Sequence, residues 1–402
     1  MRHLTPEKHP FATLAILTLF AMVGPVSIDI FTPSLPAITE FFGTSNSTAQ
    51  WSVGIFMLGF SISMLIVGPL ADRFGRKKTL YAGYTLFLLA TLVTLTTDNI
   101  QLFIAARFAQ AVFGCFGTAV ARMLARDYFS DQMEIRILSY ISAGLTVAPM
   151  AAPVIGGYIQ EFAGWHYSFL VMAAMGVISM IFLTLLPEKA QLNKGATQGF
   201  FQGYKEVLTD TRYLRFAIGC GSAFAGAFVF VAGGSFVFIS QLNLAPTTYG
   251  YFFAMAIAGY LLSASLGPKL TRNMSRSQST LLAASLLLTG ALVCLISGLM
   301  SQGQSYLGYV AGIVIYELGL GLFMPLCQAR STEHMTANIG TASGLIFFME
   351  MMLATLISSL VGVLPEAGTL SLSAITLVAM GITGFCLLGI DRKSTTSTVP
   401  AA

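Results

Sequence analysis

Residues 68–78 read Gly-Pro-Leu-Ala-Asp-Arg-Phe-Gly-Arg-Lys-Lys and separate two long apolar runs, 52–70 and 79–96. Charged residues make up only 9% of the chain, yet this one segment holds Asp72, Arg73, Arg76, Lys77 and Lys78. A membrane-spanning helix needs about 20 apolar residues, so each flanking run can cross a bilayer. We therefore expect a polytopic membrane protein in which residues 68–78, called the charged turn below, join two spans at the membrane surface.

The composition supports this expectation. The 402 residues are 55% hydrophobic, with a mean hydropathy of +0.77, whereas a soluble domain carries about 25% charged residues. The net charge of +4 is small, and no stretch combines clustered basic residues with solvated aromatic ones. We therefore expect a lipid bilayer around the chain and no nucleic-acid partner.

The cysteines give no sign of a disulfide framework or a zinc site. They lie inside apolar runs and lack the CxxC spacing of metal sites; they are Cys115, Cys220, Cys294, Cys327 and Cys386. We expect no metal and no cofactor.

Hydropathy predicts an all-α protein with twelve membrane helices. The first apolar run is too long for a signal peptide and no cleavage site follows it, so we take it as the first span. The predicted helices cover residues 11–32, 50–70, 79–96, 101–124, 135–159, 167–186, 213–241, 249–270, 279–300, 306–328, 338–363 and 371–390.

The basic residues predict the orientation of these helices. If the N-terminus is cytoplasmic and the spans alternate, all 21 Lys and Arg residues fall on the cytoplasmic side except Arg107, which lies inside a span. An excess of Lys and Arg marks cytoplasmic loops. We therefore expect a multi-pass protein with both termini in the cytoplasm.

The chain also divides into two similar halves. A polar stretch separates a six-helix bundle over 1–186 from another over 213–402, with a cytoplasmic linker over 187–212. The Gly-Pro pair at 68–69 recurs at 267–268, and Arg73 recurs as Arg272 at the same offset. Transporters built from repeats bind substrate near the midplane between them. The alternative is that any short turn between helices attracts Gly, Pro and Arg.

Four ionisable residues lie inside the predicted spans: Asp29, Arg107, Glu317 and Glu350. Each costs about 2.5–3.5 kcal/mol even on lenient scales, so four of them indicate a water-filled cavity with a function. Asp29 and Arg107 have similar predicted depths, and such a pair would load and release a proton, with Gln110 facing the same cavity. The alternatives are an Asp29 that touches interfacial water and an Arg107 that braces backbone carbonyls.

Glu317 and Glu350 lie near the middle of the tenth and eleventh spans. Neighbouring aromatic and Met side chains suit a bulky ligand that is cationic. Either acid would serve as a cation site or a second proton carrier; alternatively, one is permanently protonated and only hydrogen-bonded.

Two further features concern helix packing. The fifth span carries Pro149, Pro153, Gly156 and Gly157, which predict a close packing seam or a hinge between the halves. Asp127 ends the fourth span on the side of the charged turn, where it can pair with Arg73 or Arg76.

These motifs resemble the Major Facilitator Superfamily. The first ten residues of the charged turn match its signature G-x-x-x-D-R-x-G-R-[KR] at every fixed position. Residues 149–157 resemble the antiporter motif G-P-x-x-G-G, with Ala152 for its first Gly, and residues 107–115 resemble R-x-x-Q-G, with Ala111 for its Gly. These departures, with residues 27–36 and 122–127, resemble the Bcr/CflA drug-resistance branch.

The resemblance implies proton-coupled export across the bacterial inner membrane, with Arg107 tied to proton coupling. It also implies a cytoplasmic latch formed by the charged turn and Asp127. In the family the residue matching Asp72 contacts the start of the eleventh helix, here residues 336–338. The latch residues are Gly68, Asp72, Arg73, Gly75, Arg76 and Asp127.

The leading hypothesis is a monomeric, proton-driven antiporter for small amphipathic molecules, as in multidrug efflux. A dedicated exporter of a metabolite such as a siderophore or an amino acid is the alternative. An enzyme is disfavoured because the spans hold no HExxH and no Ser/His/Asp grouping, and the chain has no G-x-x-x-x-G-K-[ST] loop. A channel is disfavoured because the charged turn and the repeat indicate alternating access.

Overall fold

The computed structural model describes residues 5–188, 200–335, 339–362 and 368–387. In these ranges the regular structure is helical, without strands. Twelve helical stretches are long and apolar enough to cross a membrane, and each overlaps a predicted span. This confirms the all-α, twelve-span prediction for a multi-pass membrane protein.

The chain forms two compact units. Unit 1 holds Met1–Phe200, Val231–Ile257 and Val361–Val363; unit 2 holds Phe201–Phe230, Ala258–Leu360 and Leu364–Ala402. The boundaries of these units differ from the predicted boundary at residues 187–212. Residues 231–257, which connect the seventh and eighth spans, belong to unit 1 because they pack against the fifth span. The predicted linker also contains a helix of ten residues, Phe200–Thr209.

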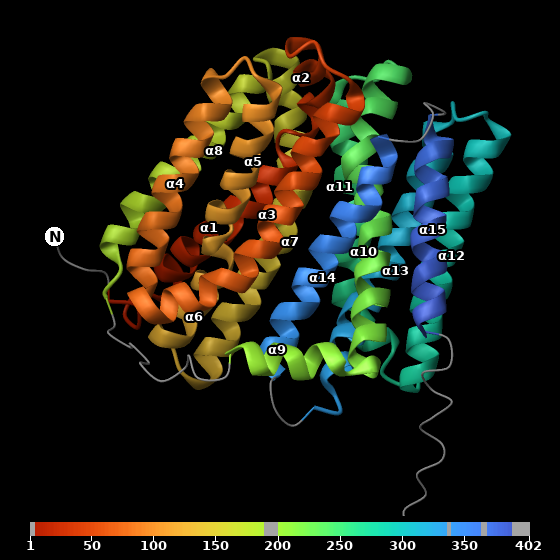
Figure 1. The fold of residues 1–402 in the computed structure, drawn as a ribbon. Coiled ribbons are helices and arrows are strands. Elements are labelled where there is room, and N and C mark those ends of the chain that lie inside the picture. The colour runs from red at the N-terminus through yellow and green to blue at the C-terminus, as the bar shows by residue number, and fades with distance from the viewer. Residues whose placement is uncertain (1–4, 189–199, 336–338, 363–367, 388–402) are drawn as a thin grey trace, which may run out of the picture. The chain divides into compact units, whose positions relative to one another are not determined.

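The helices of unit 1 run alongside one another (Figure 1). They are α1 (Pro10–Asp29), the 3₁₀ turn η1 (Thr32–Ser34), α2 (Leu35–Phe41), α3 (Asn46–Phe74), α4 (Arg76–Thr96), α5 (Ile100–Gly114), α6 (Phe116–Tyr128), α7 (Asp131–Phe162) and α8 (Trp165–Leu185).

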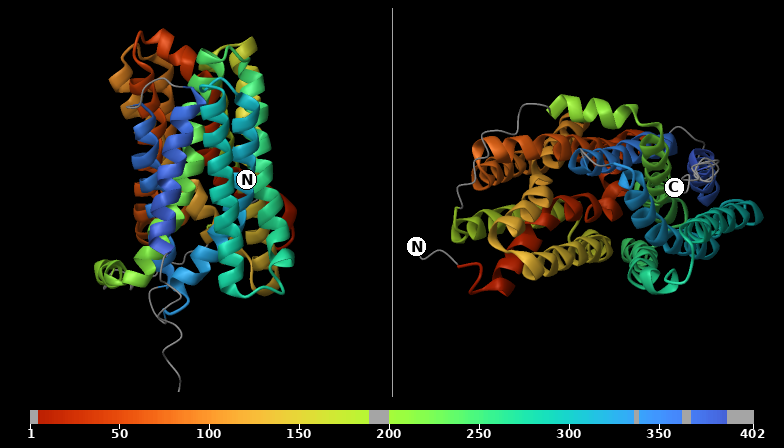
Figure 2. Two further views of the ribbon diagram at one scale, coloured as in Figure 1. Left: turned by 90° about the vertical axis from the view of Figure 1, so that its right-hand side faces the viewer. Right: turned by 90° about the horizontal axis from the view of Figure 1, so that it is seen from below.

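The remaining elements begin with α9 (Phe200–Thr209), which lies across the end of α10 in Figure 1. They continue with α10 (Thr211–Ser235), the π-helical turn η2 (Phe236–Gln241), α11 (Pro246–Leu270), α12 (Arg276–Met300), α13 (Tyr306–Thr332), α14 (Ile339–Ser359), η3 (Leu360–Gly362) and α15 (Thr369–Leu387). Within unit 2, α12 packs against α13 and α15, as Figure 2 shows.

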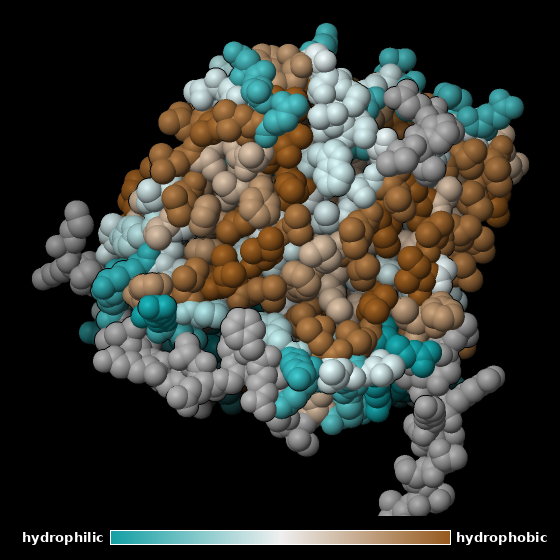
Figure 3. Space-filling view, in the orientation of Figure 1, coloured by the Kyte–Doolittle hydropathy of each residue, from teal (hydrophilic) through white to brown (hydrophobic). Residues whose placement is uncertain are grey.

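Side-chain caps fix where several spans begin. Asn99 accepts hydrogen bonds from the backbone of the first residues of α5, and Ser275 forms a capping box with Gln278 at the start of α12. Such caps satisfy amides that have no partner inside the helix. Apolar side chains cover the middle of the helices and hydrophilic ones gather near their ends (Figure 3), as a bilayer requires.

The charged turn is much shorter than predicted. The sequence reading ended the second span at residue 70 and began the third at residue 79, but α3 continues to Phe74 and α4 begins at Arg76. Only Gly75 lies between them, at φ 91°. Residues other than glycine rarely adopt this conformation. The charged residues are therefore helical ends that extend beyond the apolar part of each span.

Candidate functional site

Asp29 lies at an interruption of the first span. The span runs over Pro10–Phe41, but α1 stops at Asp29 and η1 follows. Pro33 enforces the break because it has no amide hydrogen to continue the helix. The Asp29 side chain is buried, with 5% exposure. A buried carboxyl group at a broken helix inside a span is a candidate functional group.

The interruption also provides an acceptor for Arg107. Ser27 lies in the last turn of α1, where carbonyl groups have no amide partner within the helix. Nη2 of Arg107 donates to the Ser27 carbonyl at 3.0 Å. The guanidinium carbon lies 4.0, 4.4 and 5.6 Å from the ring centres of Phe31, Phe56 and Phe169. These aromatic faces stabilise the cation.

Gln110 extends this contact from α5 to α4. Nη1 of Arg107 donates to Oε1 of Gln110 at 2.9 Å, and Nε2 of Gln110 donates to the Thr91 hydroxyl at 2.8 Å. Thr91 in turn donates to the carbonyl of Phe87. Arg107 and Gln110 are fully buried, so this chain of hydrogen bonds fixes the guanidinium between α1, α4 and α5.

The structure does not join Asp29 and Arg107 in an ion pair. Among the ion pairs of the described residues, none includes either side chain. The donors of Arg107 point to Ser27 and Gln110 instead, which agrees with the alternative of a brace to a backbone carbonyl. Asp29 interacts electrostatically with the Tyr249 hydroxyl, and both residues belong to unit 1.

The charged turn binds neighbouring helices of unit 1. Nε of Arg76 pairs with Asp127 at 2.8 Å, and the Asp127 side chain is only 7% exposed. Of the two partners expected for Asp127, the structure thus selects Arg76. Nζ of Lys77 donates to the carbonyl of Leu186 at 2.7 Å, just after α8 ends. Together these contacts connect the start of α4 to the ends of α6 and α8.

The other latch residues lie at the end of α3. Gly68 is helical, Asp72 is half-buried, and Arg73 is exposed with its guanidinium carbon 5.2 Å from the ring centre of Phe74. The partner expected for Asp72, at residues 336–338, lies outside the described residues. The latch therefore stays a prediction on that side.

The fifth span keeps its predicted prolines inside one helix. Both Pro149 and Pro153 lie within α7, which continues to Phe162. A Cβ atom added to Gly156 would collide with the carbonyl of Ile30, the residue after Asp29. Gly156 therefore packs closely against the backbone just after the break in the first span. The hinge role stays a prediction.

Gly157 forms a reciprocal contact with the start of α11. A Cβ atom at Gly157 would lie 2.6 Å from the Pro246 carbonyl oxygen, and one at Gly250 would lie 2.6 Å from the carbonyl oxygen of Pro153. Each helix therefore presents a glycine to the backbone of the other. This contact explains why residues 231–257 belong to unit 1.

Polar contacts continue this seam towards the end of α7. The hydroxyl groups of Tyr158 and Tyr251 are 2.7 Å apart, and Thr247 donates to Oε2 of Glu161 at 2.8 Å. The sequence reading missed these four residues, because separate helices carry them and no local pattern relates them.

In unit 2, Glu317 and Glu350 are both buried, on α13 and α14. Oε1 of Glu350 accepts a hydrogen bond from Nε2 of Gln328 at 2.9 Å and one from the Cys220 thiol at 3.3 Å. The sequence predicted a function for the two acids but none for Gln328, and it indicated Cys220 only as a cysteine inside an apolar run.

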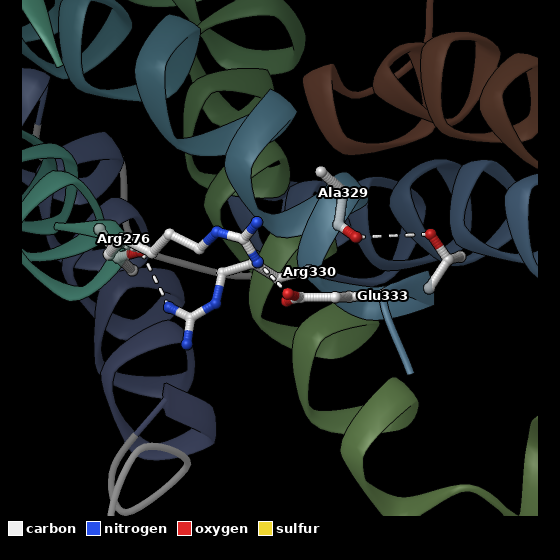
Figure 4. A network of polar contacts seen from close by, with 6 residues as sticks. Arg276, Ala329, Arg330 and Glu333 are labelled. Atoms are coloured by element: carbon white, nitrogen blue, oxygen red, sulfur yellow. Dashed lines mark hydrogen bonds and ion pairs between the residues drawn. The ribbon is translucent and has the colours of Figure 1, made fainter. Parts of the chain in front are cut away.

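A second charged cluster lies where α13 ends. Arg276 of α12 pairs with Glu333, and Nη1 of Arg330 donates to the Thr280 hydroxyl at 3.0 Å (Figure 4). Arg276 follows the second Gly-Pro pair, at residues 267–268, which repeats the pair in the charged turn. Like the charged turn, this cluster ties neighbouring helices together by charged groups at their ends.

Asp210 anchors the start of α10 in the same unit. It accepts a hydrogen bond from the Tyr213 amide at 3.0 Å and pairs with His334. Burial is the largest single influence and raises the pKa of Asp210. The hydrogen bond from Tyr213 and the contact with His334 outweigh it, so the pKa is held below its ordinary value of 3.8.

Comparison with known proteins agrees with this architecture. The model of the Major Facilitator Superfamily matches residues 15–359. The "Uncharacterized MFS-type transporter YdgK" of Bacillus subtilis is 28% identical over 98% of both chains. The "Bicyclomycin resistance protein homolog" of Haemophilus influenzae is 25% identical over 88% of this chain and 90% of that protein. The fold also matches a bacterial homologue of the human lysosomal transporter Spinster, with a TM-score of 0.72, 14% identity, and coverage of 97% and 98% of the two chains.

Proposed function

Because the chain belongs to the Major Facilitator Superfamily, in its branch of Bcr/CflA-type drug transporters, we propose that it is a proton-coupled antiporter. It exports small amphipathic compounds across the bacterial inner membrane by alternating access. The drug-resistance names of its relatives support the choice of compounds. The distribution of basic residues supports a cytoplasmic location of both termini and of the charged turn.

The observation that carries the proposal is the buried Asp29 carboxyl group. It lies at the break of the first span, and among the described residues it has no cationic partner. A buried carboxylate without a counter-charge is costly, whereas the protonated form is neutral. Asp29 therefore exchanges a proton with whichever side of the membrane it faces.

Arg107 is the fixed charge near this proton site. Its bonds to Ser27 and Gln110 hold it at the end of α1, so a change at the break alters the carbonyl that Arg107 contacts. In our proposal, loss of the Asp29 proton attracts the guanidinium away from Ser27, which moves α1 relative to α5. Proton transfer is thereby coupled to the conformation of unit 1.

The charged turn supplies the second element of alternating access. Its pair between Arg76 and Asp127 is largely shielded from solvent, so salt screens it less than it screens an exposed pair, which is worth under about 1 kcal/mol. We propose that the charged turn holds the cytoplasmic side closed in one state and is released in the other.

Transport into inverted membrane vesicles tests the proposal. A panel of amphipathic compounds is assayed with and without an imposed proton gradient, using wild type, Asp29→Asn and Asp98→Asn. Asp98 is an exposed acid between α4 and α5 and serves as the matched control. We expect gradient-driven uptake in wild type and Asp98→Asn, and loss of the gradient response in Asp29→Asn with normal insertion. Uptake that ignores the gradient in wild type would refute proton coupling, and full coupling in Asp29→Asn would remove Asp29 from the mechanism.

A further inference from the structure

Two carboxyl groups of unit 2, those of Glu317 and Glu350, are buried, and neither forms an ion pair with a described residue. Glu350 has no solvent exposure and Glu317 has 6%. The ion pairs of the described residues include neither side chain. An ionised carboxylate inside a membrane protein requires a counter-charge or extensive hydrogen bonding. Among the described residues, hydrogen bonds to Glu350 meet this requirement only in part.

Glu350 is held by one of its two oxygens. Gln328 and Cys220 both donate to Oε1, whereas Oε2 is buried and accepts no hydrogen bond. Buried polar atoms without partners are rare, and an explanation such as an absent ligand or ion is required for each. The donors to Oε1 fix the carboxyl group so that Oε2 remains available to a further donor.

Tyr260 brings the two acids into one environment. It lies on α11 and interacts electrostatically with both Glu317 and Glu350. All three side chains belong to unit 2, and they come from three different helices. Both acids therefore lie within electrostatic reach of the same tyrosine hydroxyl.

Cys220, which donates to Glu350, also contacts a second sulfur-containing side chain. The Cys220 sulfur lies 3.4 Å from the sulfur of Met324. Methionine adapts its shape to irregular ligands, and an aromatic face attracts organic cations. Among the described residues, no group of three or more His, Cys, Asp or Glu side chains could hold a metal ion. An organic cation thus fits these side chains better than a metal ion does.

We propose that Glu350, with Glu317 as a second carboxylate, binds the positively charged group of an organic cation such as an amphipathic amine or a phosphonium. This inference rests on the proposed export function, because it assigns the substrate class of that function. Oε2 of Glu350 is the contact atom for the cation. Gln328 and Cys220 are positioning residues that hold the carboxyl group.

Equilibrium binding to the full chain in nanodiscs tests the assignment without a proton gradient. The probes are tetraphenylphosphonium and triphenylphosphine oxide, which share three phenyl rings on phosphorus but differ in charge. The variants are Glu350→Gln, Glu317→Gln and Glu40→Gln, the last of which changes an exposed acid of α2 as the matched control. We expect wild type and Glu40→Gln to bind the phosphonium at least tenfold more tightly than the oxide.

Glu350→Gln should lower the phosphonium affinity at least tenfold, Glu317→Gln should lower it less, and neither should change the affinity for the oxide. A tenfold change corresponds to about 1.4 kcal/mol. Equal binding of both probes by wild type would overturn the proposal, as would unchanged phosphonium affinity in Glu350→Gln.

Alkylation of Cys220 provides a second measurement if Glu350→Gln does not fold. In a chain whose other four cysteines are serine, the phosphonium should slow the reaction of Cys220 with N-ethylmaleimide, and the oxide should not. Protection that is the same with both probes would refute the assignment. Both measurements are made at equilibrium. Failure of proton coupling in the vesicle assay with charge-selective binding intact would therefore reject only the antiport mechanism.

Discussion

Gly157→Ala tests the seam between α7 and the start of α11. The added Cβ would lie 2.6 Å from the Pro246 carbonyl oxygen and 2.9 Å from Cα of Thr247. Ordinary contact begins at 3.4 Å, so the two backbones must separate by about 0.8 Å at this point (3.4 − 2.6). Both obstructing atoms are main-chain atoms, and no side chain can rotate to relieve the contact.

The expected cost follows from two opposing effects. Overpacking of this kind costs about 1–3 kcal/mol, whereas alanine is favoured over glycine inside a helix by about 1 kcal/mol. Gly381→Ala is the matched control, because it lies in α15 and an added Cβ there meets no atom within 4 Å. The helix preference applies to both variants, so the difference between them reports the overpacking alone.

The assay is thermal unfolding of the purified proteins in one detergent. We expect Gly157→Ala to melt about 2–6 °C below Gly381→Ala, and its transport rate to fall because the seam no longer closes fully. Gly250→Ala should behave in the same way, since its Cβ would meet the backbone of Pro153. Equal melting temperatures for Gly157→Ala and Gly381→Ala would refute the reasoning.

Three further changes test other parts of the molecule. Gln110→Ala leaves a buried donor of Arg107 without its amide acceptor, so it should lower the free energy of unfolding by about 1.5–3 kcal/mol; chemical denaturation that matches wild type would contradict this. Asp72→Ala should slow transport while substrate affinity in a binding assay stays nearly unchanged, because we propose that the charged turn is a latch and not a binding site; a large loss of affinity would count against that role. Asp210→Asn should be less stable than wild type at pH 7. The lowered pKa of Asp210 stabilises the folded state at pH values above the pKa that Asp210 has in the unfolded chain. The difference should shrink as the pH falls below 3.8 in melting experiments, and a pH-independent difference would contradict the assignment.

The spans themselves were predictable because hydropathy is a property of each segment alone. Each predicted helix overlaps an observed one. The predicted ends of the spans were less accurate. Helices such as α3 continue through charged residues, which a hydropathy criterion places outside the span. The pair between Arg76 and Asp127 could be anticipated because Arg76 begins one helix and Asp127 lies at the end of another on the same side of unit 1.

Contacts between distant helices were harder to predict. Similar depth suggested that Asp29 and Arg107 meet, but the break after Asp29 exposes a carbonyl at Ser27 that the guanidinium binds instead. Depth gives one coordinate, whereas a contact also depends on the rotation of each helix and on its local breaks. The Cys220 thiol beside Glu350 is equally invisible in the sequence, because 130 residues separate the two.

The single residue between α3 and α4 has a mechanical consequence. Gly75 is the only residue that connects the two helices, so the end of α3 cannot move far without displacing the start of α4. Arg76 passes the same movement to α6 through Asp127, and Lys77 passes it to the chain after α8. Insertion of a few flexible residues after Gly75 would uncouple the helices, so that α3 could move without displacing α4, α6 or the chain after α8.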